Sequence, residues 1–149
     1  MQLTQFTDFG LRVLMYLTEQ NRETLVTITE IAEQFSIPRN HLVKVVNRLV
    51  KLNWVTAVRG RNGGLSLSVQ PNELHLGNVI RQLENHCELV NCEKSPCSLQ
   101  GQCYLKHIID KELMHFFERM DQYTLADAVN RKTGIVIAKM HQSAHDEMF

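Results

Sequence analysis

A proline divides two short amphipathic stretches in the first third of the chain, and this break does most to limit the possible folds. The stretch "TITEIAEQF" has apolar residues at helical spacing, and Thr27 or Thr29 is suited to cap its start. Pro38 disfavours helix at the residue before it but suits the first turn of a new helix. The stretch that follows carries a second apolar stripe, formed by Leu42, Val45, Val46 and Leu49. The pattern therefore predicts a helix-turn-helix at about residues 28–51.

The periodicity changes from helical to alternating directly after this unit. "WVTAVR" and "LSLSV" flank the Gly-rich "GRNGG", and Asn62-Gly63 is typical of a two-residue hairpin loop. Before the unit, residues 6–17 predict a helix with Thr7 as its N-cap. That helix is apolar on two faces, which a short chain most easily covers by dimerising. Three helices and then a hairpin at about residues 54–69 predict a winged helix within residues 1–85.

The remainder of the chain is expected to be helical apart from one loop. A fourth helix follows the hairpin, and a cysteine-containing loop spans residues 86–103. Residues 104–129 predict a long amphipathic helix and a short terminal helix, which Thr124 and Asp127 cap. Residues 130–149 are expected to form a C-terminal tail, frayed at "HQSAHDEMF" because that segment shows no packing pattern. The predicted fold class is mainly α with a small β-hairpin.

The charged residues are unevenly distributed, although the formal net charge of the chain is zero. A neutral chain on its own argues against binding to nucleic acid. Between residues 39 and 61, however, there are six basic residues and no Asp or Glu, whereas residues 104–127 have three basic and five acidic residues. A basic segment within a neutral chain indicates a local surface for an anionic partner.

This basic segment coincides with the second helix of the helix-turn-helix and with the hairpin. With the apolar stripe turned inward, the outward residues of the helix include Arg39, Asn40, His41, Lys44 and Arg48. The first turns of such a helix enter the major groove of DNA, where these side chains read base edges or bind phosphates. Arg59 and Arg61 at the hairpin are placed to reach the DNA backbone or the minor groove. We therefore expect double-stranded DNA as a partner, with a solvated basic face as the alternative.

The N-terminal residues carry no pattern typical of export or membrane insertion. They lack a basic start, and Asp8, Arg12 and Glu19 interrupt their apolar residues. We therefore expect a cytoplasmic protein without membrane contact. Because thiols stay reduced in the cytoplasm, clustered cysteines predict metal ligands or redox groups rather than disulfides.

All four cysteines of the chain lie in one stretch, "CELVNCEKSPCSLQGQC", which starts at Cys87. Four residues separate Cys92 from Cys97, and five separate Cys97 from Cys103. Structural zinc sites prefer tight C-x2-C pairs, which this spacing does not provide. Wider spacing favours an iron–sulfur cluster, whose irons take thiolates from several directions. Zinc, a redox dithiol switch and four unrelated thiols remain as alternatives.

Five segments of the chain match one known family: "LTQFTDFGLRVLMYL", "IPRNHLVKVVNRL", "VRGRNGGLSL", "VNCEKSPCSLQGQC" and "YTLADAV". They resemble the iron–sulfur winged-helix transcriptional repressors, and most of all those that sense nitric oxide. The resemblance runs in one register from the first residue to about residue 129. It implies a winged helix with a long dimerising helix, hence a homodimer, and one iron–sulfur cluster of the 2Fe–2S or 4Fe–4S type per subunit.

The resemblance also implies roles for individual residues. It makes Cys92, Cys97 and Cys103 cluster ligands, and it makes the partner subunit's Asp8 the fourth ligand. A carboxylate that simply favours the start of its helix is the alternative for Asp8. Cys87 falls outside the family pattern. His107 is one residue away from the place of a histidine ligand in a related regulator and therefore ranks below Asp8.

The function implied is that of a repressor, not an enzyme, that releases operator DNA when nitric oxide nitrosylates or destroys its cluster. A regulator of the same fold that responds to cluster status or redox state is one alternative. A small cluster-containing electron carrier is another, although it has no use for a basic segment and a wing. A zinc-stabilised DNA-binding protein is the third.

Overall fold

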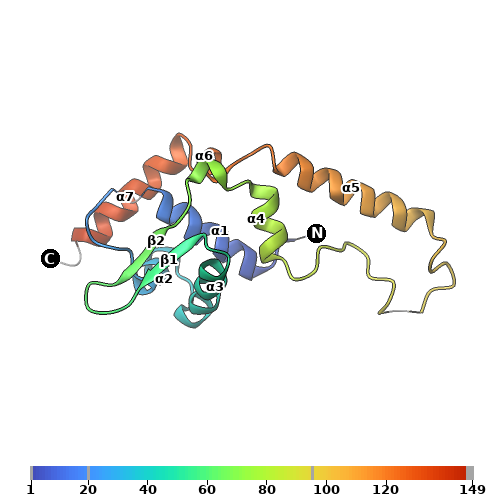
Figure 1. Cartoon of the computed structure of the whole chain (residues 1–149), viewed down its shortest axis with the longest axis horizontal. Helices are drawn as coiled ribbons and strands as arrows, with labels where there is room; N and C mark the ends of the chain where they lie inside the picture. Colours follow the sequence, from blue (N-terminus) through green and yellow to red (C-terminus); the bar gives the residue numbers. More distant parts are fainter. Residues whose placement is uncertain (1, 20, 95, 147–149) are drawn as a thin grey trace.

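The computed structural model describes residues 2–19, 21–94 and 96–146. The elements follow in the order α1 (Gln5–Thr18), α2 (Ile28–Phe35), α3 (Arg39–Lys51), β1 (Val55–Val58), β2 (Gly64–Leu67), the short 3-10 helix η1 (Pro71–Glu73), α4 (Leu76–Leu83), α5 (Tyr104–Met120), α6 (Leu125–Ala128) and α7 (Lys132–Asp146). Figure 1 shows α1 to α4, the hairpin and α7 gathered in one body, from which α5 and the loop before it extend. The predicted class, mainly α with a small β-hairpin, is confirmed.

The helix-turn-helix forms where the proline break predicts it. The N-cap of α2 is Thr27, whose hydroxyl accepts a hydrogen bond from the backbone N–H of Glu30 at 3.1 Å. Ser36 ends the helix in the left-handed region, with φ of 51°, and the chain turns through Pro38 into α3. The inward face of α3 buries all four residues of the predicted stripe, Leu42, Val45, Val46 and Leu49. The opposite face of α3 is thereby left for contacts outside the fold.

The wing is present, but its loop differs from the predicted one. Strands β1 and β2 are antiparallel, from Val55 opposite Leu67 to Val58 opposite Gly64, so the loop contains five residues. Its turn is closed by a hydrogen bond from Gly63 N to the oxygen of Gly60 at 3.0 Å, and Gly60 takes the positive φ of 109°. The prediction of a two-residue Asn62-Gly63 loop is wrong, because such a loop requires positive φ at both residues.

The wing is also joined to the segment that links α1 to α2. The backbone N–H of Leu65 donates to the oxygen of Val26 at 2.7 Å, which forms an isolated antiparallel bridge. Leu65 and Val26 are both buried in the main core. The hairpin is therefore fixed to the body of the molecule on one side.

Helix α1 begins slightly earlier than the sequence suggests. Thr4, not Thr7, is its N-cap, and the Thr4 hydroxyl accepts from the N–H of Thr7 at 3.3 Å. Thr7 lies inside the helix and is buried. The second apolar face, with Leu11 and Met15, is partly buried against the core of its own chain.

The C-terminal segment forms a helix where we expected a frayed end. α7 returns to the N-terminal body and contacts α2 (Figure 1). His141 and Ala144, both within the segment expected to fray, are buried. The ring of His141 stacks on Tyr16 at a centroid distance of 4.0 Å, and its Nε2 donates to the oxygen of Tyr16 at 2.8 Å. Hydropathy missed this helix because a histidine occupies its buried face; residues 147–149 lie outside the described part.

The short helix α6 follows its predicted cap. The hydroxyl of Thr124 accepts from the N–H of Asp127, whose carboxylate in turn accepts from the N–H of Thr124 at 2.7 Å. Throughout the residues that the structure describes, no helix has the length and apolar character required to cross a membrane.

Candidate DNA-binding surface and cysteine site

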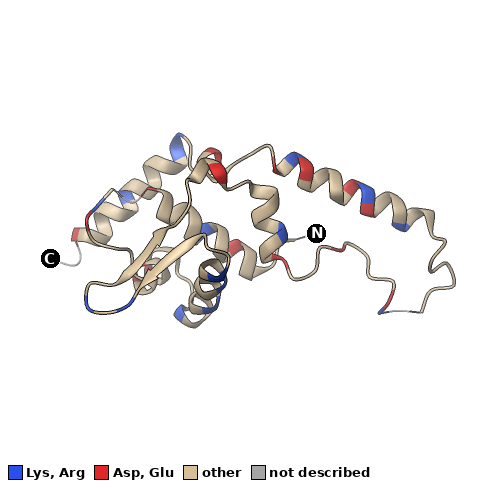
Figure 2. Cartoon of the chain, in the orientation of Figure 1, with Lys and Arg blue, Asp and Glu red and all other residues tan. Residues whose placement is uncertain are grey.

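The outward face of α3 carries exposed polar and basic side chains near its start. Arg39, Asn40, His41 and Lys44 are all exposed there. Arg59 and Arg61 are exposed in the loop of the hairpin. Figure 2 shows the blue positions of α3 and of the wing loop along the lower edge of the molecule, with no red position on α3. The structure thus places these six predicted residues in two exposed groups, one on α3 and one in the wing loop.

Arg48 is arranged differently from the other basic residues of α3. It is half-buried, and its Nη2 donates to the backbone oxygen of Gln82 in α4 at 3.0 Å. The side-chain oxygen of Gln82 lies 3.5 Å from the same nitrogen. One of the two amino groups of Arg48 is therefore bound to α4.

Three of the four cysteines line one hollow of about 600 Å³ at the start of α5. Cys92 and Cys103 are half-buried, Cys97 is exposed, and Cys103 immediately precedes the helix. Backbone hydrogen bonds from Gln100 N to the oxygen of Cys97 and from Gln102 N to the oxygen of Leu99, both 3.0 Å, make successive turns between them. The loop thus places the three cysteines of the predicted ligand set around one hollow.

This hollow provides soft donors but is not a preformed metal site. In the described ranges, no group of three or more His, Cys, Asp or Glu is placed to hold a metal ion. All four cysteines are free thiols. Thiolates are the donors that iron–sulfur clusters prefer, and a turn-rich loop of exposed residues is free to close around one. The residues present therefore supply the type of donor that an iron–sulfur cluster takes.

Cys87 is not part of this hollow. Its Sγ lies 3.9 Å from the backbone oxygen of Arg81, to which it donates a hydrogen bond. Burial raises the pKa of the Cys87 thiol, and the negative charge of Glu84 raises it further. Because metals bind the thiolate, a raised pKa makes Cys87 a poorer ligand.

Asp8 lies on α1 and does not line the hollow of its own chain. Its carboxylate pairs with Arg12, with Nη2 to Oδ2 at 2.8 Å and Nε to Oδ1 at 3.1 Å. The guanidinium of Arg12 also lies 6.0 Å from the ring centroid of Phe35 in α2. The Asp8 side chain is 45% exposed, so another molecule can reach it.

His107 and Lys106 also line the cysteine hollow, and sequence reasoning missed Lys106. The ammonium of Lys106 donates to both oxygens of Asp110, at 2.5 and 2.7 Å. This hydrogen bond is the main reason why the pKa of Lys106 is raised. A cation fixed beside thiolates offsets part of their charge. The signal available in the sequence was the i,i+4 spacing of Lys106 and Asp110 at the start of a helix.

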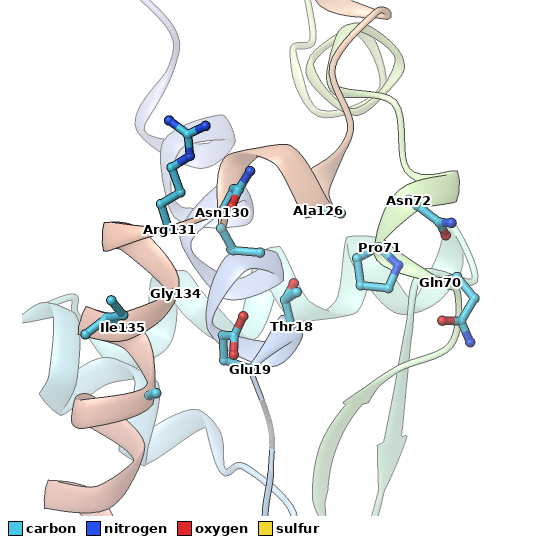
Figure 3. A pocket seen from close by; sticks show the side chains of 12 residues that line it. Thr18, Glu19, Gln70, Pro71, Asn72, Ala126, Asn130, Arg131, Gly134 and Ile135 are labelled. Atoms are coloured by element: carbon cyan, nitrogen blue, oxygen red, sulfur yellow. The ribbon is translucent and has the colours of Figure 1, made fainter.

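A second hollow, of about 620 Å³, lies between the end of α1, η1 and the start of α7 (Figure 3). Thr18 and Glu19 line it from α1, and Asn130 and Arg131 line it from the turn before α7. α7 approaches the end of α1 closely here, because a Cβ on Gly134 would lie 3.2 Å from Oε1 of Glu19. No cysteine or histidine lines this hollow, so it holds none of the predicted cluster ligands.

Comparison with known proteins places the chain in a family. Residues 3–131 match the family Rrf2, described as an iron-dependent transcriptional regulator. The chain is 45% identical over 132 residues to the HTH-type transcriptional regulator NsrR of Bacillus licheniformis, covering 87% of this chain and 92% of that protein. This finding confirms the resemblance noted from the five segments.

Solved structures of low sequence identity share the fold. CymR, the global cysteine regulator of B. subtilis, has a TM-score of 0.69 at 21% identity, covering 86% of this chain and 95% of that one. IscR of T. potens has a TM-score of 0.69 at 24% identity, covering 87% and 86%. The extent of the family match and the identity to NsrR lead to one conclusion: the chain belongs to the Rrf2 family of transcriptional regulators.

Proposed function

We propose that this regulator is a homodimeric repressor that binds operator DNA and releases it when nitric oxide attacks an iron–sulfur cluster. The observation that carries the proposal is the gathering of Cys92, Cys97 and Cys103 in one hollow of a winged-helix chain. The 45% identity to an NsrR regulator supports it.

The DNA-binding surface in this proposal consists of the start of α3 and the wing loop. Arg39, Asn40, His41 and Lys44 enter the major groove, where their donors meet base edges and phosphates. Arg59 and Arg61 contact the backbone or the minor groove beside it. Such contacts make binding dependent on salt, because each neutralised phosphate releases counterions.

The proposed dimer interface is the apolar side of α5. Tyr104, Leu105 and Met114 are 75%, 63% and 63% exposed, and Ile108 is also exposed. Several exposed apolar side chains on a helix that extends from the body are costly in water. A second copy of the same helix covers them in a symmetric dimer, which also sets two α3 helices at the spacing of two operator half-sites.

The proposed ligands are Cys92, Cys97 and Cys103, with the partner subunit's Asp8 as the fourth. When bound, an iron–sulfur cluster supplies iron that reacts with nitric oxide. A carboxylate is a poorer ligand than a thiolate for such a soft site, so the Asp8 position is where attack is expected. Asp8 has an alternative partner in Arg12 of its own helix, at 2.8 Å. Released Asp8 therefore returns to Arg12, and the two subunits lose one connection between α1 and the cysteine loop.

The proposal is tested by titrating anaerobically purified protein with nitric oxide while its visible spectrum and its retardation of operator DNA are followed together. Operator affinity is expected to fall about 5- to 150-fold as the chromophore changes. If the chromophore is lost and operator affinity stays constant, the cluster is not the sensor. Colourless protein that contains zinc and binds operator would instead support a structural metal.

A further inference from the structure

The C-terminal end of α4 is held by side chains that come from other segments. The last carbonyls of a helix have no partner within the helix and carry partial negative charge. In α4, the oxygen of Gln82 accepts from Arg48 Nη2 at 3.0 Å, and the oxygen of Arg81 accepts from the thiol of Cys87 at 3.9 Å. A cation from the recognition helix and a thiol from the cysteine loop thus cap the same helix end.

The same helix is tied to α1 and to the end of α5. Glu84, directly after α4, accepts from the N–H of Thr4 at 2.8 Å and from its hydroxyl at 3.1 Å. Arg81 forms an ion pair with Asp121, whose other oxygen accepts from the N–H of Asn78 at 2.6 Å. The ring of Phe117 in α5 lies 5.2 Å from the Arg81 guanidinium. Movement of α5 or of the loop is therefore transmitted to α4.

The loop leaves α4 at this point and packs against α5. Cys87 and Leu89 line a hollow of about 350 Å³ together with Leu113 and Phe116 of α5. The first residues of the cysteine loop thus contact the end of α4 and share a hollow with the long helix. Arg48, 34 residues before Gln82 in the sequence, reaches the same end of α4.

We infer that Arg48 is a positioning residue that couples the state of the cysteine loop to the orientation of the recognition helix. The inference rests on the proposed function, in which the loop changes when the cluster is attacked. In this inference, Arg48 acts through its contact with α4. Arg39 and Lys44, by contrast, are exposed at the start of the same helix, where the proposal places DNA. A hydrogen bond weakens steeply as its length and angle change. A shift of the end of α4 therefore either moves α3 with it or breaks the hydrogen bond between Arg48 and Gln82.

A DNA contact and a coupling residue differ in two measurable quantities. A side chain that binds a phosphate contributes about one unit to the slope of log affinity against log salt concentration. Its removal therefore lowers the operator affinity of both cluster states by the same factor. A coupling residue leaves this slope unchanged and alters the ratio between the operator affinities of the two states. We therefore measure operator affinity for the cluster-loaded and the cluster-free homodimer over a salt series.

Arg48→Ala is expected to lower the affinity ratio between the states about two- to thirtyfold without changing the salt slope. Arg48→Lys retains a cation that can reach the Gln82 oxygen and is expected to restore part of the ratio. Gln82→Ala keeps the backbone acceptor, so its ratio should equal that of the unmodified protein. Lys44→Gln is the matched control on α3 and should reduce the slope by about one unit at a constant ratio.

Two results would overturn the inference. The first is an Arg48→Ala protein whose ratio stays within about twofold of the original while its salt slope falls by about one unit, as for a phosphate contact. The second is an equal loss of ratio in Arg48→Ala and Arg48→Lys, which indicates a general packing defect. If the unmodified protein has the same affinity in both states, the proposed function itself fails, and that arm of the experiment shows it separately.

Discussion

Cys87 and Cys103 mark the two ends of the cysteine loop, and their surroundings suit different tasks. The Cys87 thiol donates a hydrogen bond to the oxygen of Arg81, and burial raises its pKa. Cys103 opens onto the hollow that Cys92 and Cys97 share. At the scale of single residues, the four thiols therefore divide into three candidate ligands and one cap of α4.

Replacing the cysteines one at a time checks this division. Cluster binding is expected to be abolished in each of Cys92→Ala, Cys97→Ala and Cys103→Ala. The proposed site supplies only three thiolates, and each variant removes one of them. Cys87→Ala is the matched control and should retain iron and sulfide at the level of the unmodified protein. Both elements are quantified per subunit after anaerobic purification. Loss of iron in Cys87→Ala together with full iron in any of the other three would contradict the assignment.

Among the elements, α7 depends on a buried polar network for its attachment. Glu30 accepts from the hydroxyl of Tyr16 at 2.7 Å and pairs with Arg22 at 2.5 Å, and His141 of α7 lies on Tyr16. The bond from His141 Nε2 to a carbonyl requires the hydrogen on Nε2. Nδ1 has no hydrogen-bond partner among the described residues and lies 3.9 Å from Oε1 of Glu30. The pKa of His141 is lowered, mainly by burial and also by Arg22, against the opposing effects of the Tyr16 carbonyl, Glu30 and Glu19.

The lowered pKa predicts that acid weakens the folded state through His141. Unfolded chain binds a proton at the ordinary pKa of 6.5, whereas folded chain does so only at a lower pH. The stabilisation is therefore complete above about pH 6.5 and is lost as the pH falls towards the folded-state pKa. His141→Phe retains an aromatic ring on Tyr16 but cannot titrate. Urea unfolding between pH 7.5 and 5.5 should show a smaller acid loss in this variant.

The exposed His86 provides the matched control for that measurement. His86 lies on the surface, so His86→Phe should leave the loss of stability in acid as it is in the unmodified protein. An equal acid loss in His141→Phe and in the unmodified chain would mean that other groups carry the whole effect.

At the scale of the whole molecule, α5 extends from the body with exposed apolar side chains, and the proposed dimer covers them. Leu105→Glu places a charge within the proposed interface, and a symmetric dimer contains the change twice. Burial of one Leu contributes about 1.5–3 kcal/mol, so the dimer is expected to weaken at least a hundredfold, on the order of 10² to 10⁴. Sedimentation equilibrium measures this.

Ile135→Glu, at a residue of similar exposure on α7, is the control and should remain dimeric. A Leu105→Glu protein that dimerises as tightly as the control would place the interface elsewhere.

The parts of the fold that rest on local patterns could be predicted from the sequence. The inward stripe of α3, the break at Pro38 and the cap at Thr124 each depend on residues a few positions apart. The docking of α7 could not, because it depends on contacts such as that of His141 with Tyr16, 125 residues away. The prediction of the wing loop was wrong for a different reason. Several types of turn suit the same Gly-rich residues, and the strand register decides among them.

The candidate site shows the same division. The resemblance to the family distinguishes Cys92, Cys97 and Cys103 from Cys87. The structure also sets Cys87 apart, through its contact with α4. Nothing in the sequence distinguishes Arg48 from Lys44, since both occupy the outward part of one helix. Only the position of Gln82, brought near by the packing of α4, separates them.

The bridge between Val26 and Leu65 bears on how wings can be exchanged between regulators of this fold. A Cβ on Gly64 would lie 2.7 Å from the oxygen of Val26 and 2.7 Å from the Cβ of Leu25, so the hairpin and the connector fit only as a pair. A grafted wing that carries a side chain in place of Gly64 would collide with the connector of this chain. The hairpin and the α1–α2 connector are therefore expected to be exchangeable between regulators of this fold only together.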